Sequence, residues 1–201
     1  MLDLNRHLFG GLEKKIATTF SPIPITPDQW TLISVLFAMG SAYFLANENF
    51  ILAIIMFIIA GFLDLVDGAV ARYRNIAKKS GAYLDTIIDR YVEGFLFFGM
   101  IFLPLPKILL PSYCWIILAL FGSLITDYVK AAAKEKNLVP EELKGGLLSR
   151  GERIILIILS LVLGIFNFTW MVYILIILAI FTNFTAFQRI ELNVRLKSDK
   201  I

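Results

Sequence analysis

The sequence has few of the residues that build disulfides and histidine sites. Cys114 is its one cysteine, so no internal disulfide can form, and His7 is its one histidine and lies outside the apolar stretches. The first twenty residues lack a continuous apolar core, so no cleavable signal peptide is predicted. No internal repeat or low-complexity tract is evident either, which leaves one compact domain over residues 1–201 as the expectation.

Apolar residues are what the chain has in abundance. Hydrophobic residues make up 58% of it and the mean hydropathy is +0.77, which is typical of an integral membrane protein rather than of a soluble domain. Six apolar stretches are separated by polar or proline-containing turns, so we predict an all-α bundle of six transmembrane helices over residues 26–190. These predicted spans are Gln29–Ala46, Phe50–Val70, Ala82–Leu103, Ile108–Val129, Glu152–Phe166 and Thr169–Phe187.

Residues 1–20 have an amphipathic pattern. Apolar residues recur every four positions, with basic residues elsewhere around the helix: Leu4, Leu8, Leu12 and Ile16 against Arg6, Lys14 and Lys15. The pattern predicts a helix lying at the membrane interface, and a partly ordered tail is the alternative. The breaker cluster from Ser21 to Pro27 then ends this segment, with Thr26 as the expected N-cap of the first span and Pro27 at its first position.

Positive charge indicates how the bundle is oriented. Six spans place both termini on one side, and of the 19 lysines and arginines Lys107 alone is expected on the opposite side. The positive-inside rule therefore predicts a protein of the cell membrane with both termini in the cytoplasm.

Four aspartates lie at the ends of the second and third predicted spans, on this same side. Asp64 and Asp67 are three residues apart and Asp85 and Asp89 are four apart, so on helices each pair shares a face. Intramembrane acids at paired spacing are costly and repel one another unless a cation lies between them. Oxygen ligands of this kind suit Mg²⁺ or Mn²⁺.

Small residues and one arginine accompany the acids. Gly68 and Gly81 leave room for a ligand to approach closely, and Arg72 is a candidate partner for a phosphate, with a membrane anchor at the helix end as its alternative role. Acids, a divalent cation, small residues and an arginine together indicate chemistry on a phosphate or diphosphate at the lipid surface.

The spacing of these residues resembles the signature of the CDP-alcohol phosphotransferase family, D-x₂-D-G-x₂-A-R-x₈-G-x₃-D-x₃-D. All its fixed positions are matched, by Asp64, Asp67, Gly68, Ala71, Arg72, Gly81, Asp85 and Asp89. The stretch from Thr26 to Thr31 also resembles the family's T-P-N-x-x-T motif, with Asp28 in place of the usual asparagine.

The resemblance implies a donor, a metal and a base. The donor would be a CDP-linked lipid. Residues that would bind its CDP or diphosphate are Thr31, Asp64, Asp67, Gly68, Ala71, Arg72, Gly81 and Asp85. Mg²⁺ or Mn²⁺ would be held by Asp64, Asp67 and Asp85, with Asp89 completing a second metal site. Asp89 would also act as the general base on a polar alcohol acceptor, and CMP would leave. The resemblance further implies a homodimer in membrane lipid.

The sequence indicates the acceptor less clearly than the donor. Arg90, Lys130, Arg150 and Arg153 are candidates for binding it, because a phosphorylated acceptor needs cations near the metal. Asp89-Arg90-Tyr91 and Arg150-Gly-Glu-Arg153 resemble family members that use inositol phosphate, including archaetidylinositol and phosphatidylinositol phosphate synthases. Those members usually have serine at the position of Asp127 and arginine at that of Ala132, so glycerol phosphate or an uncharged or amine-bearing alcohol stays open.

Two other functions stay open as alternatives. An intramembrane prenyltransferase also binds lipid diphosphates through aspartates, but usually has more spans and separates its acidic motifs. An ion transporter uses membrane acids too, but usually shows paired repeats and broken helices, and neither is evident in the sequence. No nucleic-acid partner is expected.

Overall fold

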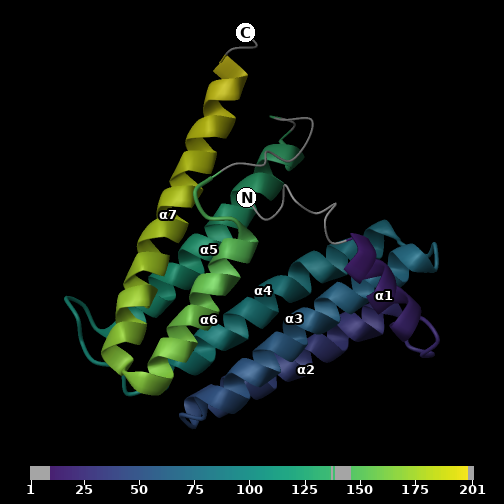
Figure 1. Ribbon diagram of the computed structural model, residues 1–201. Helices are drawn as coiled ribbons and strands as arrows, with labels where there is room; N and C mark the ends of the chain where they lie inside the picture. Colours follow the sequence, from purple (N-terminus) through teal and green to yellow (C-terminus); the bar gives the residue numbers. More distant parts are fainter. Residues whose placement is uncertain (1–9, 137, 139–145, 199–201) are drawn as a thin grey trace. The chain divides into compact units, whose positions relative to one another are not determined.

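The computed structural model describes residues 10–136, 138 and 146–198, and it is helical there apart from short connections (Figure 1). The prediction of an all-α protein is confirmed for these residues. Seven helices occur in them: α1 Gly10–Phe20, α2 Pro27–Ala46, α3 Phe50–Tyr73, α4 Lys79–Ile101, α5 Ser112–Glu135, α6 Arg150–Phe166 and α7 Phe168–Ser198. They form two compact units, with α1 to α4 in an N-terminal unit within Asp3–Leu103 and α5 to α7 in a C-terminal unit within Pro104–Ile201.

In the N-terminal unit, α2 packs against both α3 and α4, and α1 packs on α3 (Figure 1). α2 begins where the sequence predicts. The side chain of Thr26 accepts a hydrogen bond from the backbone N–H of Gln29, and the Gln29 side chain accepts one from the N–H of Thr26. This reciprocal cap satisfies backbone donors that would otherwise lack a partner at the helix end. Asn49 caps α3 in a similar way, by accepting from the N–H of Leu52.

The contact between α2 and α4 is closest where a glycine faces an alanine. A Cβ atom added at Gly99 on α4 would lie 2.8 Å from both the Cα and the carbonyl oxygen of Ala42 on α2. Only hydrogen at this position lets the two backbones approach so closely.

Gly99→Ala is therefore expected to lower the unfolding temperature in detergent, because the added methyl group forces two backbones apart. Overpacking of this kind costs about 1–3 kcal/mol. Gly94→Ala, on the same helix, is the matched control, since a Cβ there would meet no atom within 4 Å. Alanine favours a helix over glycine by about 0.8–1 kcal/mol, so the control should unfold no earlier than the wild type. Equal unfolding temperatures for the two variants would contradict the close packing.

α1 is anchored to the unit by aromatic packing. The ring of Phe20 lies edge-on to Trp30 at 5.8 Å and to Phe62 at 5.7 Å. Ile16 and Phe20 pack against a buried cluster formed by Trp30, Leu63, Val66 and Val70, and Ala17 is 2% exposed. A helix is thus observed from Gly10 to Phe20, and its position at the membrane interface stays a prediction. The predicted first residues of this helix, including Leu4, Arg6 and Leu8, lie outside the described residues.

Arg74 holds the segment between α1 and α2. It follows the last residue of α3, and its guanidinium donates hydrogen bonds to three backbone carbonyl groups, those of Ser21, Ile23 and Ile25. A segment that contains two prolines and forms no regular structure leaves such carbonyls without helical partners. Arg74 supplies the missing donors, and the connection is thereby fixed against the end of α3.

In the C-terminal unit, α7 packs against both α5 and α6. Polar side chains cross between α5 and α7: Thr126 donates to the carbonyl of Thr182 at 3.0 Å, and Asn183 donates to that of Leu118 at 2.9 Å. Asn167 separates α6 from α7, as predicted, and its side chain accepts from the N–H of Thr169 at 2.7 Å.

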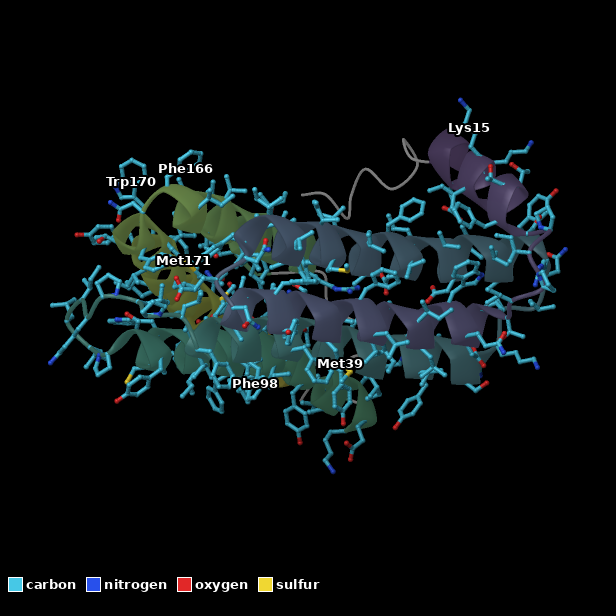
Figure 2. The ribbon with its side chains drawn as sticks, turned by 90° about the horizontal axis from the view of Figure 1, so that it is seen from below. Lys15, Met39, Phe98, Phe166, Trp170 and Met171 are labelled. Carbon is cyan, nitrogen blue, oxygen red and sulfur yellow. The ribbon has the colours of Figure 1, made fainter. Side chains whose placement is uncertain are left out.

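Four of the described helices are long and apolar enough to cross a membrane: α2, α3, α5 and α7, the last over Phe168–Val194. Large apolar side chains lie on the outside, among them Met39, Phe98, Phe166 and Trp170, at 48%, 55%, 73% and 52% exposed, whereas Met171 is fully buried (Figure 2). α4 carries charged residues in its first half and α6 has 17 residues, so neither meets the same criterion. Six membrane spans stay a prediction.

Several predicted boundaries are displaced. The fourth predicted span starts at Ile108, but α5 begins at Ser112, after Pro111, which cannot donate a helical hydrogen bond. The sixth predicted span ends at Phe187, but α7 continues to Ser198. Polar residues mark the edge of an apolar stretch, but they do not end a helix unless they cap it or break it.

Candidate active site

Three aspartates from two helices meet in the N-terminal unit. Asp64 and Asp67 come from α3 and Asp85 from α4, and one carboxylate oxygen of each lies within 4.8 Å of the others. Asp67 is 5% exposed, and the other two are partly buried. Three carboxylates this close repel one another strongly, and a hard divalent cation such as Mg²⁺ or Mn²⁺ is the partner that their oxygen atoms suit. The donor set therefore fits the predicted metal, with Asp64, Asp67 and Asp85 as its holders.

Asp89, the fourth predicted ligand, does not belong to this group of three among the described residues. It lies one helical turn further along α4 and is 7% exposed. The guanidinium of Arg90 is its neighbour, with Nη1 at 3.8 Å from Oδ2. Asp89 is thus set apart from the three clustered carboxylates, and a second metal site stays a prediction.

Thr31 on α2 holds one of the three acids. Thr31 is 3% exposed, and its hydroxyl group donates a hydrogen bond of 2.5 Å to Oδ2 of Asp67. A hydrogen bond from a buried hydroxyl group fixes the orientation of the carboxylate that accepts it. The family resemblance predicts that Thr31 binds CDP, which stays a prediction, and the structure places its hydroxyl group on Asp67.

A cleft of about 370 Å³ opens beside these acids. It is lined by most of the residues predicted to bind the donor: Thr31, Asp67, Gly68, Ala71, Arg72, Gly81 and Asp85. It is also lined by residues that the sequence analysis did not select, including Asp28, Ile76 and Lys78. Asp28 comes close to Gly81, because a Cβ atom at Gly81 would lie 3.2 Å from its Oδ1. Six of the eight signature residues thus surround one space, although the turn between α3 and α4 separates them in sequence.

Arg72 reaches into the same region from the last turn of α3. Its side chain turns back over Gly68, where a Cβ atom would lie 3.2 Å from both Nη1 and Nη2. Its Nε donates a hydrogen bond of 2.6 Å to Oε1 of Glu13 on α1. Glu13 was missed in the sequence analysis, and no local pattern could have revealed it, because 59 residues separate it from Arg72.

The four residues predicted to bind an acceptor divide between the two units. Arg90 belongs to the N-terminal unit, and Lys130, Arg150 and Arg153 belong to the C-terminal unit. Whether they act at one site stays a prediction.

In the C-terminal unit the structure joins Arg153 to Asp127. Arg153 is 1% exposed, and its Nη2 lies 2.9 Å from Oδ2 of Asp127. Arg189 approaches the other oxygen of Asp127 at 3.8 Å and donates to the carbonyl of Thr126 at 2.9 Å. Arg189 lies beyond Phe187, where the sixth predicted span ends, yet it is buried on α7 at 6% exposed.

Comparison with known proteins places this site in a family. The model of the CDP-alcohol phosphatidyltransferase family matches residues 24–187. A bifunctional IPC transferase and DIPP synthase of Aquifex aeolicus is 34% identical over 183 residues, which are 86% of this chain, and the match spans 40% of that longer protein. An archaetidylinositol phosphate synthase of Pyrococcus horikoshii is 33% identical over 149 residues, or 73% of this chain and 74% of that protein.

Solved structures have the same fold. The phosphatidylinositol phosphate synthase of Mycobacterium tuberculosis with CDP-DAG bound aligns with a TM-score of 0.79 at 23% identity, covering 90% of this chain and 93% of that one. The same enzyme in complex with manganese and citrate aligns with a TM-score of 0.80, covering 90% of this chain and 88% of that one. Since the family model covers most of the chain and includes the aspartates, the glycines and Arg72, the protein belongs to the CDP-alcohol phosphatidyltransferase family.

Proposed function

We propose that this protein transfers a phosphatidyl-type or archaetidyl group from a CDP-linked lipid to a polar alcohol and releases CMP. The observation that carries the proposal is the cluster of Asp64, Asp67 and Asp85, which lies at a cleft also lined by Gly68, Ala71, Arg72 and Gly81. Acids from two helices, small residues and an arginine around one space suit a nucleotide-linked diphosphate. Membership of the family supplies the class of reaction.

In this proposal the cleft binds the CDP part of the donor. Gly68 and Gly81 keep it open, since a side chain at either position would approach Arg72 or Asp28 to 3.2 Å. Arg72 lies beside Gly68 and would bind the diphosphate through its terminal nitrogen atoms. Mg²⁺ or Mn²⁺ held by the three aspartates would offset the charge of the diphosphate and of the leaving CMP.

Asp89 is the proposed general base. It takes the proton of the acceptor hydroxyl, whose oxygen forms a bond to the lipid-linked phosphorus while the bond from that phosphorus to CMP breaks. Its separation from the three clustered carboxylates supports this role, because a carboxylate that binds a metal is less available to accept a proton. Burial of Asp89 at 7% exposed keeps competing water away from it.

Inositol phosphate is the first candidate acceptor. Relatives from Pyrococcus horikoshii and Methanothermobacter thermautotrophicus, 33% and 29% identical, are archaetidylinositol phosphate synthases. Arg90, Lys130, Arg150 and Arg153 are the cations proposed to bind its phosphate. The contact of Arg153 with Asp127 favours a second candidate, an uncharged or amine-bearing alcohol, because the carboxylate already neutralises part of the positive charge there.

For the chain as a whole, we propose one domain embedded in the cell membrane. Its six long helices α2 to α7 would all span the bilayer, with α1 at the interface and both termini and the active site on the cytoplasmic side. Clustering of lysine and arginine at the ends of the chain and in the turns after α3 and α5 supports this orientation. A homodimer is proposed from the family resemblance alone.

Release of CMP tests the function directly. The purified protein in detergent would be given CDP-linked lipids with diacylglycerol or archaeol tails, Mg²⁺ or Mn²⁺, and one acceptor at a time from inositol phosphate, glycerol phosphate, inositol and amino alcohols. CMP released with one acceptor and not with the others supports the proposal and names the acceptor. No release with any of them would contradict it, and release of diphosphate from a prenyl diphosphate would support a prenyltransferase instead.

A further inference from the structure

The contact between Glu13 and Arg72 joins the N-terminal helix to the cleft. Glu13 is the one acidic residue of α1, and its carboxylate lies 2.6 Å from Nε of Arg72 on α3. Both side chains are about half exposed, at 40% and 53%. An ion pair with this exposure adds little to stability, so its main consequence is for where the guanidinium lies.

The atoms in contact determine which donors of Arg72 remain available. Glu13 accepts from Nε, whereas Nη1 and Nη2 lie next to Gly68, at the cleft. The two terminal nitrogens carry four of the five N–H donors of an arginine. Because Glu13 holds the Nε atom, the terminal nitrogens of Arg72 stay beside Gly68 and are free of the contact with α1. An unheld arginine side chain would have to lose its rotamer freedom when a ligand binds.

The position of Glu13 is itself well determined by packing. Ile16 and Phe20 of α1 pack against a buried cluster from α2 and α3, and Ala17 between them is buried. Arg74 fixes the segment that follows α1. Glu13 lies one turn before this packed stretch, so the packing of α1 places its carboxylate beside Arg72.

We propose that Glu13 is a positioning residue for the binding of the CDP-linked lipid. It holds Nε of Arg72 and so directs both terminal nitrogens of that arginine toward the diphosphate in the cleft. The inference rests on the proposed function, since it assumes that a CDP diphosphate binds there. Glu13 itself does not touch the substrate.

The test measures the affinity of the full-length protein for CDP with Mg²⁺ by calorimetry, together with KM and kcat for the CDP-linked lipid. Glu13→Ala is expected to weaken CDP binding and raise KM by about fivefold, with kcat at saturating donor nearly unchanged. Glu13→Gln should recover part of the loss, because its amide oxygen still accepts from Nε. Lys15→Ala is the matched control, because Lys15 is exposed on the same helix and points away from α2 and α3 (Figure 2). This variant should bind CDP and turn over as the wild type does.

A double variant separates positioning from a purely structural role. In an Arg72→Ala background, Glu13→Ala should cause no further loss of CDP affinity, because the group that it positions is gone. An equal loss with and without Arg72 would overturn the proposal, since Glu13 would then act through the docking of α1. Tighter CDP binding by Glu13→Ala would also overturn it, because Glu13 would then compete with the diphosphate. If the wild type binds CDP and Glu13→Ala binds it with the same affinity, this inference alone is refuted. If the wild type does not bind CDP, the proposed function is refuted as well.

Discussion

Asp64→Asn is expected to remove the metal dependence of CDP binding and to lower turnover roughly 10²- to 10³-fold. Asp64 supplies one of three carboxylate oxygens that lie within 4.8 Å of one another. The substitution keeps the size of the side chain but removes its charge, so two carboxylates are left to hold a divalent cation. The loss should appear in calorimetry as a CDP affinity that Mg²⁺ no longer raises and that EDTA no longer lowers.

A control for this substitution should change a carboxylate elsewhere. Glu48 lies exposed in the turn between α2 and α3, at the opposite end of those helices from the aspartates. Glu48→Gln should therefore leave both CDP binding and turnover at wild-type levels. If Asp64→Asn kept the full Mg²⁺-dependent affinity for CDP, the three aspartates would not be the metal site.

Asp89→Asn is expected to lower kcat by about 10²- to 10⁴-fold while CDP still binds in the presence of Mg²⁺. Asparagine cannot accept the proton of the acceptor hydroxyl, so the chemical step fails. Binding should survive, because Asp89 is outside the group of three carboxylates and does not line the cleft. The comparison with Asp64→Asn is therefore informative, since the two substitutions make the same chemical change on neighbouring helices and are expected to separate binding from catalysis.

Both quantities should be measured on each variant, turnover as CMP release from the CDP-linked lipid and binding as calorimetry with CDP. A variant Asp89→Asn that turns over at the wild-type rate would exclude Asp89 as the base. One that loses Mg²⁺-dependent CDP binding as Asp64→Asn does would make Asp89 a metal ligand instead.

The start of α2 was predictable because its cause is local. Thr26 and Gln29 are three residues apart, and the reciprocal cap that they form needs nothing from the rest of the chain. The break at Asn167 is equally local. The pairing of acids on helix faces follows from the helical repeat, so the group formed by Asp64, Asp67 and Asp85 could be anticipated. Ends without a local cause were misjudged, and the continuation of α7 beyond Phe187 is the largest case.

Contacts between distant residues could not be anticipated in this way. The hydroxyl of Thr31 is 36 residues from Asp67 in sequence, and its role on that carboxylate depends on how α2 packs against α3. Arg153 was expected to meet an acceptor, but its guanidinium lies against Asp127, 26 residues away. Such contacts require two helices to pack in one particular rotation and register. The chain has 19 basic and 16 acidic residues, so the sequence does not show which acid pairs with which base.

The sequence by itself determined the helical class, the local caps, and which acids share a face, because these depend on composition and on residues within a turn or two of each other. Tertiary structure alone decided how the site is held: Thr31 on Asp67, Glu13 on Arg72, and the separation of Asp89 from the other three carboxylates. The physical reason is that a side chain's direction is set by helix packing, and packing is a property of whole faces that no single spacing encodes.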